Sequence, residues 1–483
     1  MRKRFEQQLE LGVKAISATP YLLKSRDDIP AMVAVLLKIF NTKEYNEKIF
    51  SLLEEKIIKN KKATGRPGLN LWQIFVLAQF RLALNLDYDR LHYMAYSDST
   101  LRQLLGIETE VGFEKVEWSY QRICDNVRLL DDDTLRKIND IIVQFGHEVF
   151  KKKETERLFV KTDSFVVESN VHFPTDYNLL WDSARKSINS INWFKDKYPC
   201  HVDGWRKIKD WFRSLKSLSR EVGQTSASGG KGKEKRLKDV VTQYLTKAGA
   251  FLEKVEKSKA DLPIIEITDI AKIYELEHFV ELLNKHIDLV GRRLIKGEKI
   301  PHEEKLFSIF EQYTEWVTKG KTRPNVELGK KLSITTDQFG LIIDYYIMEN
   351  EADSEIVIST ADRILTKYEI ESWSFDKGFW HKDNKSLLSL YINQVIMPKK
   401  GKCNKEEAEY EQRPVFKKLK NKHSAVESNI NELENKGLDR CPDKTFHGFK
   451  RYVSIGITAY NLHKIGKELL RQEREQEKLR QAA

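Results

Sequence analysis

Cysteine is scarce in this sequence, and long apolar runs are absent. The four cysteines are Cys124, Cys200, Cys403 and Cys441. No two of them stand at CxxC spacing, which argues against a zinc knuckle and against a disulfide framework. No stretch approaches the roughly 18 consecutive apolar residues that a membrane-spanning helix needs, and Met1 is followed by charged residues rather than by the apolar core of a signal peptide. We therefore expect a cytoplasmic protein with reduced thiols and no membrane partner.

Positive charge exceeds negative charge over the 483 residues. Lys and Arg number 83 and Asp and Glu 72, which gives a formal net charge of +11. Hydrophobic residues make up 40% and aromatic residues 10%, which is enough apolar material for the roughly two to four domains that this length allows. Global disorder is therefore excluded. The net charge favours a polyanionic partner, because each phosphate contact made by Lys or Arg releases condensed counterions.

Residues 1–150 have the apolar spacing of helices and lack the alternation typical of strands. The turn-forming residues 64–68 precede Asn70, which can cap a helix, and two further short helices are expected after Asp87 and near Ser99. Three compact helices entered through a basic Gly/Pro loop fit a helix-turn-helix-like DNA-binding unit. An ordinary helical bundle is at least as good an interpretation of the same pattern.

Residues that favour strands occur first at 158–167 and return after residue 330. Between them, residues 181–324 have a mainly helical pattern, interrupted at 221–236 by a flexible linker rich in Gly, Ser and Lys. Its GGKGK run lacks the Walker spacing, so it does not predict a phosphate-binding loop. The later expected elements are a hairpin (331–336 and 341–348), a helix from 353, a strand (371–376), a helix (383–391), a strand (394–397) and a long helical region. This order predicts a mixed α/β layer architecture.

Three acidic residues occupy related positions in these elements. Asp163 lies within the first strand, Asp376 ends the strand after the first crossover helix, and Glu427 lies on a helix expected to cover the sheet. Functional groups in an open α/β sheet gather at the carboxyl ends of neighbouring strands, so the two aspartates can converge. Carboxylates suit Mg²⁺, and two such ions about 3.5 to 4 Å apart can flank a phosphoryl centre. Taken singly, each acid is as well explained by a surface or capping role.

Six segments resemble parts of the DDE transposases of bacterial insertion sequences. Three of them resemble the acidic motifs of that family: VKTDSFVVESNVHFPTD (160–176), SFDKGFW (374–380) and HSAVESNI (423–430). The segment GRPGLNLWQIF (65–75) resembles the entry to the family's helical domain, and the match continues in GLDRCP (437–442) and YNL (460–462). The order of the six segments along the chain makes the resemblance more specific than any one motif.

The resemblance implies an α/β protein with an RNase H-like catalytic core built on a mixed sheet. The implied domains are a helical N-terminal domain that binds DNA ends (1–150), the core (151–180 and 325–435), a large, mainly helical insertion (181–324) and a helical C-terminal region (436–483). It also implies that Asp163, Asp376 and Glu427 form the catalytic triad and hold two Mg²⁺ ions, for which Mn²⁺ is expected to substitute.

The implied function is a DNA transposase that cuts and joins insertion-sequence ends by metal-dependent phosphoryl transfer. Its partners would be double-stranded DNA, both the terminal inverted repeats of its element and the target, and a second copy of the chain bound to the same DNA. Such a protein is expected at the nucleoid of a prokaryotic cytoplasm. Two alternatives stay open: an RNase H-like nuclease or other recombinase, and a non-catalytic, transposon-derived DNA-binding protein.

The helix of Glu427 departs from the family pattern in its flanking cations. Many relatives place an Arg one turn before the catalytic Glu and a Lys about two turns after it, where this chain has His423 and Glu434. The candidate DNA contacts are Arg66, Lys399, Lys400 and His423. Among the other basic residues, Arg81, Arg90 and Arg102 fit either groove contacts or solvated helix positions.

Polar and aromatic residues near the insertion favour structural roles. His172 and Asp176 are close to Asp163 in the sequence, but a polar loop cluster is the favoured interpretation. The tryptophans Trp181, Trp193, Trp205 and Trp211 are expected to pack in a helical core rather than to stack on bases.

Overall fold

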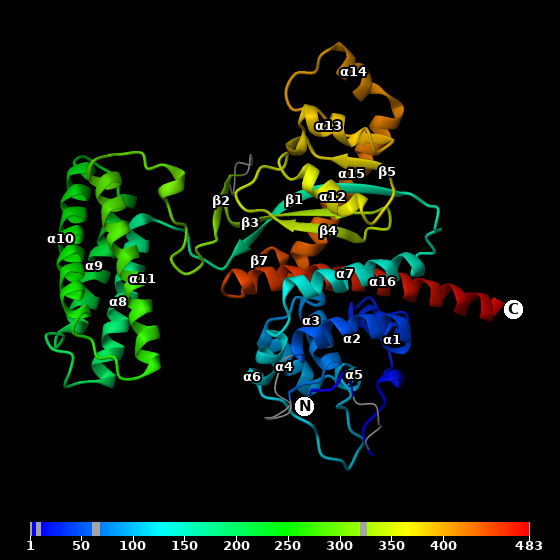
Figure 1. Ribbon diagram of the computed structural model, residues 1–483, viewed down its shortest axis with the longest axis horizontal. Coiled ribbons are helices and arrows are strands. Elements are labelled where there is room, and N and C mark those ends of the chain that lie inside the picture. The colour runs from blue at the N-terminus through cyan, green and yellow to red at the C-terminus, as the bar shows by residue number, and fades with distance from the viewer. Residues whose placement is uncertain (1, 6–10, 60–67, 319–325, 483) are drawn as a thin grey trace. The chain divides into compact units, whose positions relative to one another are not determined.

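The computed structural model describes residues 2–5, 11–59, 68–318 and 326–482, which divide into two compact units (Figure 1). Unit 1 comprises Met1–Asn170 and Glu315–Ala483, and unit 2 comprises Val171–Thr314. In the described part of the chain, no helix combines the length and the apolar composition needed to cross a membrane.

The first part of unit 1 is helical, as the spacing of apolar residues predicts. After a short 3-10 turn (Ile16–Ala18), its helices are α1 (Ile29–Asn41), α2 (Lys43–Ile57), α3 (Leu71–Ala83), α4 (Tyr88–Ser97), α5 (Ser99–Leu104), α6 (Tyr120–Val127) and α7 (Asp132–Val149). Asn70 caps α3 through a reciprocal capping box with Gln73, and the Asp87 and Asp98 side chains cap α4 and α5. These caps bond amide groups that the first helical turn leaves without partners, which fixes where each helix begins.

One mixed sheet follows in the described residues of unit 1. Its strands are β1 (Leu158–Ser169), β2 (Glu315–Thr318), β3 (Val326–Thr336), β4 (Ile342–Ile347), β5 (Ile370–Phe375), β6 (Gln394–Ile396) and β7 (Arg440–Cys441). The order is β2-β3-β1-β5-β6, with β4 on β3 and β7 on β1. Strands β3 and β4 form the predicted antiparallel hairpin, and β3 is also antiparallel to β1. Strand β5 runs parallel to β1, and β6 runs parallel to β5. The predicted mixed α/β architecture is therefore confirmed.

Helices flank this sheet and join it to the first helices. The later helices are α12 (Val357–Leu365), α13 (Lys382–Leu388), α14 (Lys405–Gln412), α15 (Pro414–Leu433) and α16 (Phe446–Ala482), with short helical turns at Lys377–Phe379 and Glu434–Leu438. Helices α7 and α16 pack together between the sheet and the first helices (Figure 1). Asn461 of α16 bonds both the backbone of Ile342 in β4 and the side chain of Asn139 in α7, so one buried amide ties three elements together.

Buried hydrogen bonds hold the central strands in register. The Trp373 indole on β5 donates to Thr162 Oγ1 on β1 at 2.7 Å, and that hydroxyl lies 2.7 Å from Thr335 Oγ1 on β3. All three side chains are buried, and Trp373 also belongs to the apolar core under α12 and α13. Strands β3, β1 and β5 are thus fixed at one level, next to Asp163.

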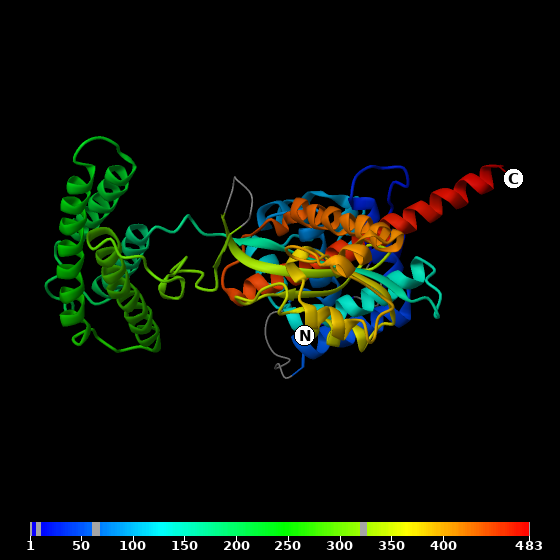
Figure 2. The same cartoon turned by 90° about the horizontal axis from the view of Figure 1, so that it is seen from above.

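Unit 2 is built from long helices, which Figure 2 shows in green. They are α8 (Asp176–Lys197), α9 (Ile208–Ala227), α10 (Lys233–Lys259) and α11 (Ile267–Val290), followed by short helical turns at Gly291–Ile295 and His302–Glu304. Trp205 is buried in its core, and Trp181, Trp193 and Trp211 pack against that core, as predicted. His172 lies 3.3 Å from Asp182, and Asp176 pairs with Arg293 at 2.6 Å, so both polar residues have partners within this unit.

Two sequence-based boundaries are wrong. The predicted flexible linker, 221–236, is mostly helical: α9 continues to Ala227 because Val222 packs in the core, and α10 begins at Lys233. Only residues 228–232 connect the two helices. The predicted insertion, 181–324, includes β2, a four-residue strand too short to leave a pattern in the sequence.

Candidate active site

Parallel pairing brings Asp163 and Asp376 to one edge of the sheet. The register pairs Thr162 of β1 with Phe375 of β5. Asp163 and Asp376 directly follow these two residues in the sequence. The Asp163 carboxylate is partly buried and accepts a hydrogen bond from the Ser164 backbone N–H at 2.8 Å, whereas Asp376 is exposed just after β5. The two predicted aspartates are therefore neighbours on the sheet, although they are far apart in the sequence.

Helix α15 brings Glu427 to the same region. It packs against β1, β5 and β6, with Val426 and Leu433 buried toward the sheet. One turn before Glu427, His423 is buried, and its Nδ1 lies 3.1 Å from Ser374 Oγ on β5. This contact fixes the rotation of the helix, and Glu427 is left exposed on the same helix.

Three other carboxylates act on the pKa of Asp163. The pKa of Asp163 is raised to about 7, first by burial and then by the negative charges of Asp376, Asp353 and Glu427, against the hydrogen bond from the Ser164 backbone. A carboxylate with such neighbours is destabilised in its charged form unless a cation joins it. The candidate site therefore contains all three predicted acids and one that the sequence analysis missed, Asp353.

Asp353 lies in the loop between β4 and α12. Its Oδ1 accepts hydrogen bonds from Ser164 Oγ on β1 and from Lys331 Nζ on β3, both at 2.7 Å. A Cβ added to Gly378 would lie 3.0 Å from Asp353 Oδ2, so the glycine lets the loop after Asp376 approach this carboxylate. In the sequence, Asp353 stands at the start of an expected helix, where an acid is ordinary, and nothing indicates its contact with a strand 189 residues away.

The carboxylates have the chemistry of a site for a hard divalent cation. Oxygen ligands are those that Mg²⁺ prefers, and a cation would relieve the repulsion that raises the pKa of Asp163. Within the described ranges, no three His, Cys, Asp or Glu side chains already stand as a complete metal-ligand set. Metal binding would therefore require the carboxylates to turn toward one another.

Two of the predicted DNA contacts, Lys399 and His423, have partners within the protein. The Lys399 ammonium pairs with Glu407 and lies over the Trp380 ring, so its charge is already neutralised within the protein. His423 faces the sheet instead of solvent, and burial lowers its pKa to about 4, so it is uncharged at neutral pH. Lys400 is exposed, as a phosphate contact must be, and Arg66 lies outside the described residues.

Two arginines of the first helices are structural as well. Arg81 is 2% exposed, pairs with Asp443 at 2.8 Å and lies over the Tyr88 ring. Arg102 is equally buried and pairs with Glu108 at 2.6 Å. Neither can reach a DNA groove from these positions, which corrects both sequence interpretations. Arg90 remains exposed on α4.

Exposed cations on α15 were not singled out by the sequence analysis. Lys420 precedes Glu427 by seven residues, or about two helical turns, and Lys417 lies nearby on the same half of the helix. Both are exposed, and neither forms an ion pair in the described part of the chain. Their position relative to Glu427 could have been read from the helical spacing, but their lack of partners could not.

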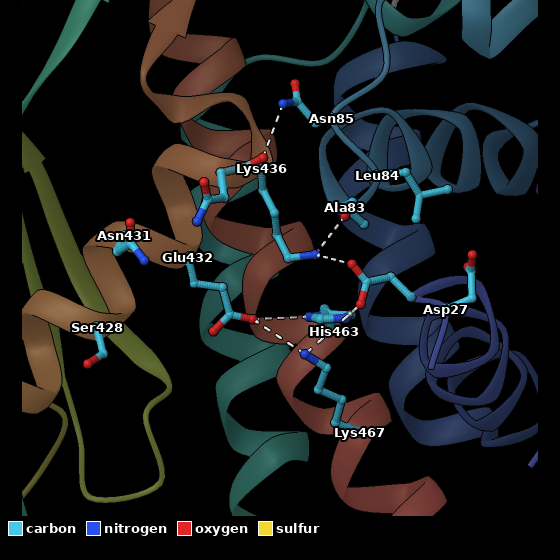
Figure 3. Close-up of a pocket in the computed structure, with 12 residues that line it drawn as sticks. Asp27, Ala83, Leu84, Asn85, Ser428, Asn431, Glu432, Lys436, His463 and Lys467 are labelled. Carbon is cyan, nitrogen blue, oxygen red and sulfur yellow. Dashed lines mark hydrogen bonds and ion pairs between the residues drawn. The ribbon is translucent and has the colours of Figure 1, made fainter. Parts of the chain in front are cut away.

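A polar cavity of about 480 Å³ lies beside α15, just past Glu427 (Figure 3). There the buried ring of His463 on α16 lies 2.7 Å from Asp28 Oδ1 and 3.4 Å from Glu432 Oε1. Lys436 Nζ donates to Asp28 and to the Ala83 carbonyl. The network ties α15 to α16 and to the start of α1, so it anchors the helix that carries Glu427.

Burial acts to raise the pKa of Glu432, but its contact with His463 and the charge of Lys464 lower it to about 2. The hydrogen bond from His463 likewise holds the pKa of Asp28 well below its usual range. Both carboxylates are thus charged at neutral pH and stabilised by the protein's own groups.

Comparison with known proteins identifies no relative: no family model matches the chain, and neither a curated protein nor a solved structure matches it. The residues of the site are therefore the basis on which a function can be argued.

Proposed function

We propose that this protein is a DNA transposase of the DDE type, which cuts and joins insertion-sequence ends by metal-dependent phosphoryl transfer. The observation that carries the proposal is that the register of β1 and β5 places Asp163 beside Asp376, while α15, which carries Glu427, packs against both strands. These are the three acids of the motifs that resemble the family. A mixed sheet with Asp163 on its central strand is consistent with an RNase H-like core.

The proposed roles follow from the surroundings of each residue. Asp163, Asp376 and Glu427 would supply the oxygen ligands for Mg²⁺, and Asp353, held by Lys331 and Ser164, would position the first two. A bound Mg²⁺ pair would stabilise the charge that develops on the phosphoryl oxygens. Of the exposed cations, Lys417 and Lys420 on α15 are suited to hold the DNA backbone beside Glu427.

The proposed reaction has two steps of one kind. Water first attacks the phosphodiester at the end of the element, and the bond to the 3′ oxygen breaks to leave a free 3′-hydroxyl. That hydroxyl then attacks a phosphodiester of the target DNA and displaces a target 3′ oxygen. A pair of chains on the DNA would carry out these steps at both ends of the element.

The test is incubation of the purified full chain with end-containing DNA and Mg²⁺. We expect a nick at one defined phosphodiester and joining of the new 3′ end to a target plasmid, both lost in excess chelator. Hydrolysis without joining would favour an RNase H-like nuclease instead. Binding without either reaction would favour a transposon-derived DNA-binding protein.

A further inference from the structure

Helix α9 of unit 2 carries a row of like charges on one face. Its sequence places a cation at each of four positions spaced by four, three and four residues: Lys209, Arg213, Lys216 and Arg220. This spacing aligns the four side chains within a narrow arc of the helix. At about 1.5 Å per residue, the row, here called the α9 stripe, is roughly 16 Å long.

The stripe faces solvent because the opposite side of α9 packs in the core of unit 2. Ile208, Leu215 and Val222 are buried there. Lys209, Arg213 and Arg220 are exposed, and the half-buried Lys216 extends over the Phe212 ring at 5.5 Å. The cations therefore stand on the outer surface of a rigid helix.

Acidic partners are missing along the stripe. The two acids of α9, Asp210 and Glu221, lie to one side of the stripe, about a sixth of a turn or more around the helix from its cations. In the described part of the chain, no ion pair involves any of the four cations. Elsewhere on this helical pair the charges are used: Lys238 pairs with Glu234, and Arg236 donates to the carbonyls of the connecting residues.

The charge of the chain is concentrated in this region. Residues 206–247 contain twelve Lys or Arg and four Asp or Glu, a net charge of +8 against +11 for the whole sequence. Like charges one turn apart on a helix repel each other. A polyanion would remove that repulsion and release its own counterions, so it is the partner that the stripe favours.

We propose that the α9 stripe binds the phosphate backbone of double-stranded DNA without reading its sequence. The length of the stripe matches about five successive phosphates of one DNA strand, at 3.4 Å per phosphate. The exposed residues of this face are Lys, Arg, Ser and Gln, and the neighbouring Phe212 ring is half-buried and covered by Lys216. The face therefore offers no exposed aromatic platform for unstacked bases and no large exposed apolar side chain to enter a lipid surface. The choice of DNA as the duplex rests on the proposed function.

The test compares two full-length variants that lose the same charge from the same unit. The stripe variant is Lys209→Gln/Arg213→Gln/Lys216→Gln/Arg220→Gln. The control neutralises four cations outside the stripe that also lack ion pairs: Lys257→Gln/Lys285→Gln/Lys296→Gln/Lys299→Gln. Binding to a scrambled duplex of about 30 base pairs is measured against salt concentration without divalent cations.

Each lost phosphate contact should lower the slope of log K against log salt by about 0.9, so the stripe variant should lose about three to four units and at least ten-fold in affinity. The control should lose less than about one unit, and Arg213→Lys/Arg220→Lys should keep the wild-type slope. Thermal unfolding checks that all variants are folded. Equal losses in the stripe variant and its control, or preferred binding to anionic lipid vesicles or single strands, would overturn the proposal.

Cleavage of end-containing DNA in Mg²⁺ is measured on the same proteins. Cleavage by the wild type together with an unchanged salt slope in the stripe variant would overturn the α9 stripe and leave the proposed function intact. If the stripe variant lowers the salt slope but the wild type never cleaves DNA, the α9 stripe would be supported and the proposed function would be overturned.

Discussion

Two groups of carboxylates in unit 1 have opposite surroundings. Asp28 and Glu432 are bonded to His463 and to neighbouring lysines, and the pKa of each is lowered. Asp163 is partly buried and has other carboxylates as neighbours, and both effects raise its pKa, to about 7. Both groups lie along α15, which carries Glu427 and Glu432 on successive turns.

The difference separates a structural network from a candidate site. The protein itself supplies the positive charge that Asp28 and Glu432 need, so their contacts stabilise the fold. Beside Asp163, the Lys331 ammonium is bonded to Asp353. The remaining negative charge costs folding free energy, which a ligand of opposite charge would recover.

The sharpest test of this comparison is catalytic. Asp163→Asn, Asp376→Asn and Glu427→Gln should each reduce strand cleavage by about 10³-fold or more, because each removes a metal ligand rather than a core contact. The measurement is single-turnover cleavage of end-containing DNA. Asp383→Asn serves as the control, because Asp383 is a largely exposed acid on neighbouring α13. This variant should cleave DNA at the wild-type rate. Near-normal cleavage by any triad variant would remove that residue from the site.

The second prediction concerns stability and has opposite signs in the two groups. Glu432→Gln should destabilise the protein by about 1 to 3 kcal/mol at pH 7.5, because it takes a charged partner from the buried His463. Asp163→Asn should instead stabilise it by about 1 to 3 kcal/mol, because it removes a charge that burial and like charges disfavour. Urea unfolding without divalent cations measures both, and destabilisation by Asp163→Asn would contradict the comparison.

The pH dependence gives the same contrast. The folded-state pKa of Asp163 is raised, so its penalty is absent below the unfolded value near 4 and complete above about 7. The advantage of Asp163→Asn should therefore grow between these two pH values and then level off. The pKa of Glu432 is lowered, so its contribution is complete above about 4.5 and is lost as the pH falls toward 2.

The sequence predicted elements and motif residues better than partners. Asp163 and Asp376 could be expected at one edge because parallel strands end together. Arg81 could not be recognised as a core residue, because its partner Asp443 lies 362 residues away. Helical spacing gives the direction of a side chain relative to its own helix, whereas burial depends on the elements that pack there. The same limit explains why the sequence does not show that Arg102 and His423 are buried.

Asp353 provides a smaller, intermediate test of the candidate site. Asp353→Asn should reduce cleavage by about 10- to 100-fold, as expected for a residue that positions metal ligands. The effect should appear as a higher Mg²⁺ concentration for half-maximal cleavage, which a purely structural change would not produce. Lys331→Met should shift the Mg²⁺ dependence in the same direction, because Lys331 holds the Asp353 carboxylate. An unchanged Mg²⁺ requirement in both variants would exclude this positioning role.

The smallest expected effect is on the salt dependence of DNA binding. It distinguishes two lysines of unit 1 that the sequence cannot tell apart. Lys420 is exposed without an ion pair in the described residues, whereas Lys399 is paired with Glu407. Lys420→Ala should lower the salt slope of DNA binding by about one unit and weaken binding to all sequences alike. Lys399→Ala should leave the slope unchanged, because a lysine that already has a carboxylate partner releases few counterions from DNA. Binding isotherms at several salt concentrations decide between them, and an equal loss of slope in both variants would mean that the internal ion pair of Lys399 opens on DNA.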